Sequence, residues 1–529
     1  MKGDIDCFLI GHNEMSISAQ IKLFKHNYGK SSKNYRERSK YNLAHVKYHG
    51  NVYSISDAFH ELCGQTNDNL VMFPAFSLTI AYLGSYLANR GISIGYIDSF
   101  NIGKKILIEN LCEKRIKIVA ITTTYYLSAL PITDIVKTIR EYSTETIIII
   151  GGPFILNQVR DLDAHKLQNL LKSLGADVYV SSRQGEASLY EVIEAIKKDR
   201  SIYNIPNIFY MENGEYVYTK TNEEQNDIDA NRVRWELFQE DIPNNVNTRT
   251  SVSCPFSCEF CSFPKSAGKY KSASMETIEH ELDVLYSLGK VKGFSIIDDT
   301  LNFPPQRFKS ILKMMIKKGY GFKWSCFLRC EHVDREMIEL MKESGCIQVF
   351  CGIESGSQII LNNLNKRTSV SSYQKGFSLL NEYDITSVAS IFVGFPGETC
   401  ITYKETCDLI EDVKPTFIQP RLWWYDHNAP IYEKRLEHNL KGNGYEWSHN
   451  TMDSSTALEL VDNLILSTQN SIHLTEYPIP FNMMVNGYHI EKVKQFIKSF
   501  SMCIREGIEK PDYTENSEEL VQNLCNSMK

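Results

Sequence analysis

Three cysteines at the spacing CxxxCxxC are the feature that most constrains this chain of 529 residues. They are Cys254, Cys258 and Cys261, and they lie within the segment Ser251–Pro264. Three thiolates that converge from so short a loop can hold three irons of a four-iron four-sulfur cluster, which leaves one iron open to bind another molecule. The sequence therefore predicts a loop that surrounds a 4Fe-4S cluster.

A structural zinc site is the nearest alternative for these cysteines. Such a site needs a fourth ligand, usually Cys or His at a recognisable spacing, and no second CxxC or HxxxH pair follows the loop. Phe256, Phe260 and Phe263 lie around the loop, where they would shield a cluster from water. These aromatic neighbours favour an iron–sulfur cluster over a hydrated zinc loop.

Length and composition restrict the class of protein. A chain of 529 residues is too long for one hydrophobic core, so we expect two large domains with smaller extensions. The net charge of -7, without a dense Lys/Arg stripe, argues against nucleic acid as the main partner. No apolar run reaches the length of about 18 residues that a membrane span needs, and the first residues have too short an apolar core for a signal peptide. We expect a cytoplasmic protein whose 14 cysteines stay reduced or ligate metal.

The chain divides into five predicted segments. Residues 1–65 are expected to be an N-terminal extension, 66–200 a doubly wound α/β domain, 201–246 a linker, 247–430 an open βα barrel and 431–529 a mainly helical extension on the substrate side. Apolar strands alternate with helices in the second segment, which is typical of a parallel sheet. Ligands of such sheets bind at the carboxyl ends of the strands.

Strands and helices also alternate at regular spacing in the fourth segment. Strands are expected at 249–254, 292–298, 322–329, 347–353, 385–394 and 416–424. Six such units fit an open βα barrel, with the cysteine loop after the first strand and chemistry at the carboxyl ends of the strands.

This barrel, with its CxxxCxFC loop, resembles the radical S-adenosylmethionine (SAM) family and its partial (βα)6 barrel. The resemblance implies that SAM binds the open iron and is cleaved to methionine and a 5'-deoxyadenosyl radical. It also implies that SAM contacts the residues that end the barrel strands. These are Asp298, Asp299, Arg329, Glu354, Ser355, Gly394 and Pro396. Any one of them alone would be better read as a solvated loop acid or a turn glycine, but their occurrence at successive strand ends favours a shared site.

The doubly wound segment before the barrel resembles the Rossmann-like (flavodoxin-like) cobalamin-binding domain of cobalamin-dependent radical SAM enzymes. The resemblance implies that the corrin and its nucleotide tail lie against the strand ends. The residues concerned are Pro74, Ser77, Leu78, Thr122, Thr123, Thr124, Tyr125, Gly151, Gly152 and Pro153. The segment has no GxGxxG, so a nicotinamide site is not expected. It also lacks the DxHxxG motif, which leaves the lower axial ligand of cobalt open, and a sheet that binds nothing remains the alternative.

Aromatic and hydrogen-bonding side chains gather after the last barrel strand. Trp424, Tyr425, Trp447 and His449 are expected to form a substrate lid or pocket wall, with an interdomain seam as the alternative. No catalytic side chain is assigned.

Together the two modules resemble class B radical SAM methyltransferases. That family implies methylation of an unactivated carbon or a phosphinate phosphorus in a natural-product or peptide intermediate, through a 5'-deoxyadenosyl radical and methylcobalamin. Within it, the segments 6–13 and 447–453 resemble the PhpK-like P-methyltransferase family. The expected partners are a small-molecule or peptide substrate and a reducing electron donor of the flavodoxin or ferredoxin type, with no nucleic acid and no membrane. Two alternatives remain: a cobalamin-binding radical SAM enzyme that rearranges its substrate without methyl transfer, and a non-enzymatic metal-binding scaffold.

Overall fold

The computed structural model describes residues 4–65, 76–113, 115–510 and 514–529. The chain separates into two compact α/β units. Unit 1 consists of Met1–Met15, Phe76–Asp241 and Glu276–Leu288, and unit 2 of Ser16–Ala75, Ile242–Met275 and Gly289–Lys529. No described helix is both long and apolar enough to cross a membrane.

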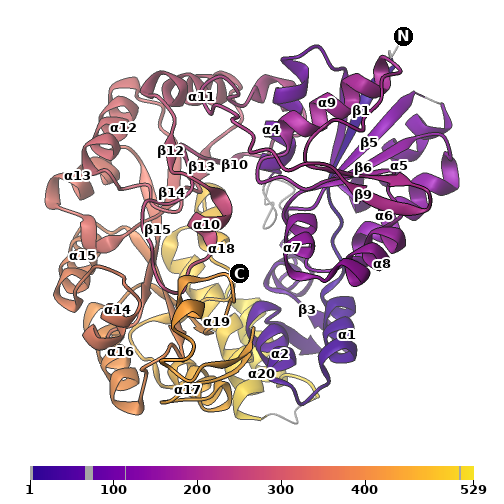
Figure 1. The fold of residues 1–529 in the computed structure, drawn as a ribbon. Coiled ribbons are helices and arrows are strands. Elements are labelled where there is room, and N and C mark those ends of the chain that lie inside the picture. The colour runs from indigo at the N-terminus through magenta and orange to yellow at the C-terminus, as the bar shows by residue number, and fades with distance from the viewer. Residues whose placement is uncertain (1–3, 66–75, 114, 511–513) are drawn as a thin grey trace. The chain divides into compact units, whose positions relative to one another are not determined.

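Unit 1 is built on a sheet with the strand order β4-β1-β5-β6-β7-β8-β9 (Figure 1). The strands are β1 (Ile5–His12), β4 (Ile94–Ser99), β5 (Ile116–Thr122), β6 (Ile147–Gly151), β7 (Val178–Val180), β8 (Ile208–Glu212) and β9 (Glu215–Tyr218). Strands β4 to β7 run parallel in this order, and β8 and β9 are antiparallel additions. Since β1 lies between β4 and β5, the winding direction reverses between β1 and β5, where doubly wound sheets bind ligands at the carboxyl ends.

The helices of unit 1 follow its strands in the alternation expected of a doubly wound domain. They are α4 (Leu78–Ala88), α5 (Phe100–Cys112), α6 (Leu130–Tyr142), α7 (Pro153–Asp161), α8 (Ala164–Leu174), α9 (Glu186–Lys197), η3 (Trp235–Phe238) and α11 (Met275–Ser287). Ile148, Ile149 and Ile150 of β6 are all at most 1% exposed, so both faces of the central strands are covered. A continuous run of β-branched residues is what a strand buried on both faces requires.

Unit 2 is organised around a second sheet, with the order β10-β13-β14-β15-β16-β17-β20. The strands are β10 (Asn245–Thr248), β13 (Gly293–Ile296), β14 (Lys323–Phe327), β15 (Cys346–Glu354), β16 (Thr386–Val393), β17 (Phe417–Leu422) and β20 (Ile472–His473). All neighbours in it pair in parallel. The helices between them in unit 2 are α12 (Pro305–Lys318), η4 (Cys330–His332), α13 (Arg335–Glu343), α14 (Gln358–Asn363), α15 (Val370–Glu382), α16 (Cys400–Val413) and α17 (Ser454–Ser467). This is the open βα barrel expected from the sequence.

Smaller elements complete unit 2. Those before the barrel are α1 (Ile17–Tyr28), α2 (Lys33–Glu37), η1 (Arg38–Asn42), β2 (Val46–Tyr48), β3 (Asn51–Tyr53), α3 (Ile55–Asp57) and η2 (Ala58–Leu62). Those within or after it are β11 (Ser251–Val252), α10 (Phe263–Ala267), β12 (Lys271–Ser272), η5 (Pro430–Lys434), β18 (Lys441–Asn443), β19 (Glu446–Ser448), α18 (Pro478–Val485), α19 (Ile490–Glu509) and α20 (Glu518–Asn526). The early elements pack on the late ones: Lys47 and Asn516 exchange two hydrogen bonds of 2.9 Å, and Arg36 pairs with Asp462 at 3.1 Å.

The structure places several segment boundaries differently from the sequence analysis. Residues 1–65 are not one extension, because β1 lies inside the sheet of unit 1 and the rest packs in unit 2. Residues 201–246 are not a linker either: they supply β8, β9 and the fully buried rings of Trp235 and Phe238. The first barrel strand is β10 instead of 249–254. Its alternating residues Asn245 and Asn247, which lie beside Gly293 and Ser295 of β13, lack the apolar pattern that predicts a strand.

Candidate functional site

The cysteine loop begins directly after β10 and is fixed by a buried carboxylate. Asp298, which is 2% exposed, accepts hydrogen bonds from the backbone and hydroxyl groups of Thr250 and Ser251 over 2.6 to 3.1 Å. Ser253 then adopts a positive φ of 70°, and the Cys254 thiol lies 3.3 Å from the hydroxyl of Thr300. The barrel therefore holds the entry to the loop in one conformation.

The three thiols of the loop lie close enough to act on one another. Burial raises the pKa of Cys258, and it raises the pKa of Cys261 to about 11, with further upward contributions from the neighbouring thiols. Without a metal, thiolates are therefore disfavoured here. Iron binding would supply the charge that stabilises them, as metal coordination deprotonates thiols.

Among the residues that the structure describes, no group of three His, Cys, Asp or Glu side chains is arranged to hold one metal ion. Four tetrahedral ligands of one zinc ion must all lie within about 2.0 to 2.3 Å of it, whereas a four-iron cluster is larger and holds its thiolates further apart.

Aromatic rings surround the cysteines as the sequence suggested. The Phe256 ring lies 5.1 Å from that of Phe303 and 5.8 Å from that of His332, and Phe260 lies 5.0 Å from Phe392. The guanidinium of Arg329 lies 3.8 Å from the centre of the Phe256 ring. These rings restrict the access of water to the thiols.

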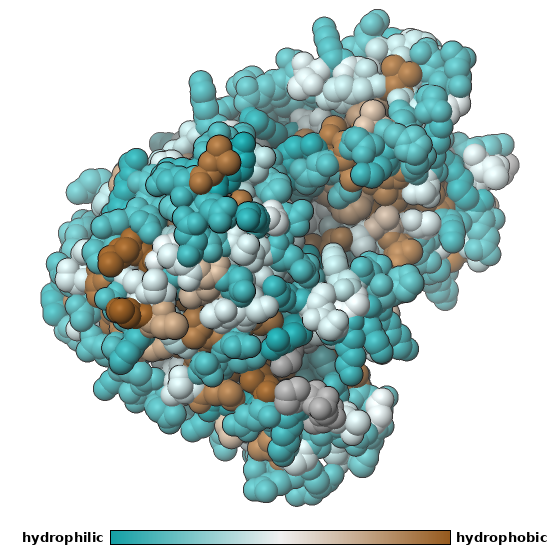
Figure 2. All heavy atoms as spheres, turned by 60° about the horizontal axis from the view of Figure 1, so that its bottom comes forward, coloured by the Kyte–Doolittle hydropathy of each residue, from teal (hydrophilic) through white to brown (hydrophobic). Residues whose placement is uncertain are grey.

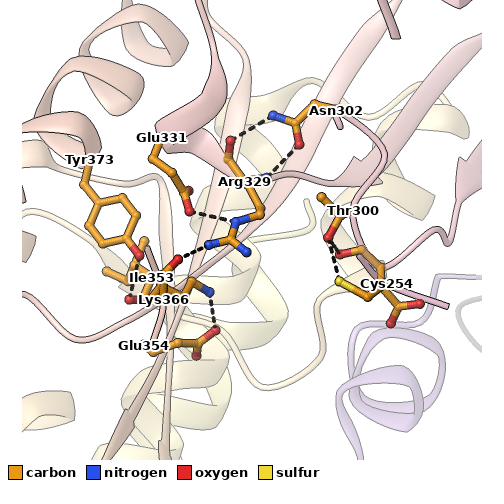
Figure 3. Close-up of polar contacts among 10 residues, drawn as sticks. Cys254, Thr300, Asn302, Arg329, Glu331, Ile353, Glu354, Lys366 and Tyr373 are labelled. Carbon is orange, nitrogen blue, oxygen red and sulfur yellow. Dashed lines mark hydrogen bonds and ion pairs between the residues drawn. The ribbon is translucent and has the colours of Figure 1, made fainter. Parts of the chain in front are cut away.

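A network of buried charges lies at the carboxyl ends of β14 and β15 (Figure 3). Arg329 donates to Glu331 at 2.8 Å and also to the backbone oxygen of Lys366. Lys366 donates to Glu354 at 3.1 Å. Burial alone would lower the pKa values of Lys366 and Arg329, but the carboxylates beside them raise both above their ordinary values. Both cations also lower the pKa of Cys258, against the effect of burial, so they favour anionic sulfur.

Glu354 is held in a strained backbone conformation. Its φ is 63°, which is rare for a residue that is not glycine. A Cβ on Gly352 would lie 2.5 Å from its Oε1, so only glycine fits two residues before it. The hydroxyl of Tyr373 donates to the carbonyl of Ile353 at 3.1 Å and fixes the preceding peptide (Figure 3). Strain that the surroundings enforce in this way is typical of functional sites.

The other residues expected to contact SAM differ in what they offer. The carboxylate oxygens of Asp298 are already occupied by four donors, whereas the neighbouring Asp299 is exposed. Ser355 is buried against Thr406 with 3.1 Å between the hydroxyls. Pro396 accepts a bond of 3.1 Å from Asn363 at its carbonyl. Asp298 and Ser355 are thus committed to the scaffold, and Asp299 is the carboxylate free to face a ligand.

Two of the residues expected to contact substrate, Trp447 and His449, pack against the loop after β16. Gly394 has a φ of 104°, and a Cβ on it would lie 2.2 Å from the Trp447 ring. His449 lies 3.0 Å from the Gly394 carbonyl and stacks on Trp447, whose indole donates to Trp423 at 2.9 Å. Tyr425, Trp447 and His449 are all at most 9% exposed, and Trp424 alone of the four expected residues is exposed, at 44%. The sequence alone gave no indication of which of these four side chains are buried and which one is exposed.

The carboxyl ends of β5 and β6 in unit 1 form a glycine cradle. Gly152 has a φ of 110°, and a Cβ on it would lie 3.0 Å from the backbone nitrogen and hydroxyl of Thr123. Thr123 donates from its backbone and its hydroxyl to the Gly151 carbonyl. The hydroxyls of Thr124 and Thr79 lie 3.0 Å apart, and the backbone N–H of Ser77 donates to the carboxylate of Asp98 at 3.0 Å. Thr122 ends β5, Pro153 begins α7 directly after β6, and Leu78 begins α4, while the expected contact Pro74 lies outside the described residues.

Apolar side chains stand exposed beside this cradle. Tyr125, Leu127 and Leu130, after β5, are 44%, 76% and 54% exposed. Such side chains are in the minority on a mostly hydrophilic surface (Figure 2). A large flat ligand would cover apolar groups of this kind.

The sequence analysis gave no role to His12, which ends β1 at the switch point of the same sheet. Its side chain is 6% exposed, burial lowers its pKa to about 4, and its Nδ1 has no hydrogen-bond partner among the described residues. The sequence signal that could have identified His12 is a polar residue at the end of an apolar strand.

Comparisons with known proteins agree with this architecture. Residues 248–410 match the model of the radical SAM superfamily. The chain is 25% identical over 321 residues to an uncharacterized methyltransferase from Pyrococcus horikoshii, covering 58% of this chain and 67% of that protein. The fold is similar to TsrM from Kitasatospora setae, a radical SAM methyltransferase solved with cobalamin and a [4Fe-4S] cluster, with a TM-score of 0.60, 14% identity and coverage of 83% and 97%. It is also similar to OxsB, a cobalamin-dependent SAM radical enzyme solved with aqua-cobalamin, with a TM-score of 0.62, 13% identity and coverage of 100% and 83%.

The extent of these matches limits what each one shows. The chain spans about two thirds or less of the length of the first curated relatives that it matches. At identities of 13% and 14%, the likeness to TsrM and OxsB establishes the fold.

Proposed function

We propose, on the premise that the chain belongs to the radical SAM superfamily through residues 248–410, that it is a cobalamin-dependent methyltransferase. Its acceptor would be an unactivated carbon or a phosphinate phosphorus of a small-molecule or peptide intermediate. The observation that carries the proposal is the placement of three mutually interacting thiols, without a fourth ligand in the loop, beside the buried ion pair of Lys366 and Glu354.

The chemistry of these groups explains why such a protein would combine them. When bound, the cluster supplies an electron that cleaves SAM to methionine and an adenosyl radical, and cobalamin supplies a methyl group. Ordinary methyl transfer from SAM requires a nucleophilic acceptor, which an unactivated C–H or P–H does not provide. A reducing donor of the flavodoxin or ferredoxin type would deliver the electron.

The residues of unit 2 would bind SAM and exclude water. Asp299 offers a free carboxylate for the amino group of SAM, and Arg329 and Lys366 keep positive charge beside Cys258. The loop that begins at Gly394 is held in place by Trp447 and His449, so it could present its backbone to the adenine without rearrangement.

The residues of unit 1 would bind cobalamin by shape. Gly151 and Gly152 allow a close approach of the backbone, Tyr125 and Leu127 offer apolar surface, and Thr124 offers a hydroxyl. The binding of cobalamin by TsrM and OxsB, which share the fold, supports this assignment.

The proposal is tested by purification under anaerobic conditions with hydroxocobalamin, iron and sulfide. We expect corrin absorption, close to four irons per chain, and S-adenosylhomocysteine together with a methylated product when substrate is present. 5'-Deoxyadenosine without S-adenosylhomocysteine would instead support a rearrangement without methyl transfer. Stoichiometric zinc with no cleavage of SAM would end the enzymatic proposal.

A further inference from the structure

We call the inner face of the unit 2 sheet the lumen. The strand register places Phe350, Gly352, Ser390, Phe392 and Arg421 on this face. All five keep exposed surface. The alternate residues of the same strands, which point outward, are fully buried: Cys351, Ile353 and Ile391 are 0% exposed and Leu422 is 2% exposed. Inward residues that retain accessible surface line a space in which a ligand could lie.

One wall of the lumen is aromatic. The rings of Phe327, Phe350 and Tyr477 lie 5.2 to 5.4 Å from one another. Gln348 donates to the carbonyl of Tyr477 at 2.9 Å, which fixes the segment that carries this ring. The Oε1 of Gln348 has no partner among the described residues. The wall is thus rigid and apolar, with an acceptor beside it.

Arg421 faces this space from β17 with most of its hydrogen-bonding capacity unused. A guanidinium has five N–H groups. Among the residues that the structure describes, that of Arg421 donates one hydrogen bond, to the carbonyl of Thr475 at 3.0 Å, and its buried Nη1 has no partner. Gln419 donates to the same carbonyl at 2.9 Å and so fixes the segment on which Arg421 rests. Since a buried donor without a partner is costly, the unpartnered Nη1 is suited to an anion.

The charges around Arg421 leave it available. Glu37 and Glu476 are the carboxyl groups that act on it, and Glu37 forms no ion pair with it. Burial raises the pKa of Glu37 to about 8, so at neutral pH this carboxyl is mostly protonated. Arg421 therefore keeps a positive charge that Glu476 offsets only in part.

We propose that Arg421 and the aromatic wall form the acceptor-substrate site, and that the substrate carries an oxyanion next to an apolar group. The oxyanion, a carboxylate or a phosphorus oxyanion, binds the guanidinium at its unpartnered Nη1, and the apolar group lies against Phe350. The identification of the bound ligand as the substrate rests on the proposed function. The anion-binding site itself rests on the geometry of the lumen alone.

The test measures binding to the holoprotein by calorimetry with three probes of similar shape: phenylphosphinate, benzoate and neutral benzamide. We expect one of the two anions to bind at least about tenfold more tightly than benzamide, and the preferred anion distinguishes phosphorus from carboxylate recognition. Arg421→Gln should remove that preference, and Arg421→Lys should retain part of it because it keeps the charge. Arg335→Gln is the matched control, since Arg335 is an exposed arginine paired with Glu382.

Two outcomes overturn the inference. One is equal binding of all three probes by the natural protein, and the other is an anion preference that survives in Arg421→Gln. A loss of SAM binding in Arg421→Gln, with cluster content and the melting temperature unchanged, would assign Arg421 to SAM and would also overturn it. Cleavage of SAM by the natural protein is recorded in parallel: cleavage without anion preference rejects this site alone, whereas absent cleavage rejects the proposed function.

Discussion

The two candidate sites differ in the charge state of their buried side chains. At the barrel mouth of unit 2, Lys366 and Arg329 are buried as paired ions, and their partners raise their pKa values despite burial. At the sheet mouth of unit 1, burial shifts His12 and Asp98 toward their neutral forms, with pKa values of about 4 and 6, and backbone, hydroxyl and apolar groups form the rest. Paired ions suit a site where electrons and charge move. Neutral surfaces suit a large ligand recognised by shape.

Substitution of a cluster cysteine should affect only one of the two sites. Cys258→Ala leaves two thiols in the loop, so we expect loss of most of the iron and a decrease of at least about 100-fold in 5'-deoxyadenosine formation. Corrin absorption after loading with cobalamin should stay the same, because unit 1 is unchanged. Cys112→Ala, an exposed cysteine of unit 1, is the control. Equal loss of cobalamin in Cys258→Ala would show that the two sites do not form independently.

Removal of one partner of a buried ion pair should strongly destabilise unit 2. Lys366→Met leaves Glu354 buried and unpaired, and we expect a decrease of roughly 3–5 kcal/mol in the free energy of unfolding. The double substitution Glu354→Gln with Lys366→Met should recover part of this loss, as seen in chemical denaturation. Lys404→Met, which breaks an exposed pair with Asp408, should cost no more than about 0.5 kcal/mol. A similar loss in the free energy of unfolding for Lys366→Met and Lys404→Met would show that the buried pair is no more important for stability than the exposed one.

Acid should weaken unit 1 through His12. Its pKa in the folded protein, about 4, lies below the ordinary 6.5, so the unfolded chain binds the proton more readily between these values. The stability that neutral His12 provides is complete above pH 6.5 and is lost as the pH falls toward 4, by up to about 3 kcal/mol.

Hydrogen exchange of peptides from β1 and β5 between pH 7 and 4.5 measures this loss. His12→Gln, which cannot titrate, should flatten the dependence for these peptides. His473 of unit 2, whose pKa burial lowers to about 3, would affect other peptides and so serves as an internal comparison. An unchanged pH dependence in His12→Gln would contradict the assignment.

The glycine cradle should be sensitive to one added methyl group. Gly152→Ala combines a φ of 110° with a contact of 3.0 Å to Thr123, so we expect a cost of about 1–3 kcal/mol and weaker retention of cobalamin on gel filtration. Gly91→Ala is the control, because Gly91 has a φ of 77° but nothing within 4 Å of an added Cβ. It should cost about 1 kcal/mol and leave cobalamin retention unchanged. Weaker retention in both variants would mean that backbone strain, and not the cradle, is responsible.

Sequence patterns predicted the architecture well where the signal was local. Runs such as Ile147–Ile150 fix buried strands, and the fold class, the order of the strands in the barrel and the cysteine loop were all expected from them. The match of residues 248–410 to the radical SAM superfamily confirms the family resemblance. The contacts proposed for SAM and cobalamin stay predictions.

Other features depend on contacts between distant parts of the chain. Lys47 meets Asn516, 469 positions later, so no local pattern could have joined the early segment to unit 2. The polar strand β10 was missed because its inward side faces polar neighbours.

By itself the sequence determined the spacing of Cys254, Cys258 and Cys261, the two alternations of strands and helices, and the acids and glycines at the strand ends. Only the tertiary structure decided what each of these groups does. In the folded protein, the carboxylate of Asp298 accepts four hydrogen bonds, and Trp447 and His449 pack against Gly394. The guanidinium of Arg421 stays largely unpaired. The physical reason is that covalent spacing sets which residues follow one another, whereas burial and hydrogen-bond partners depend on strand register and on side chains far away in the chain.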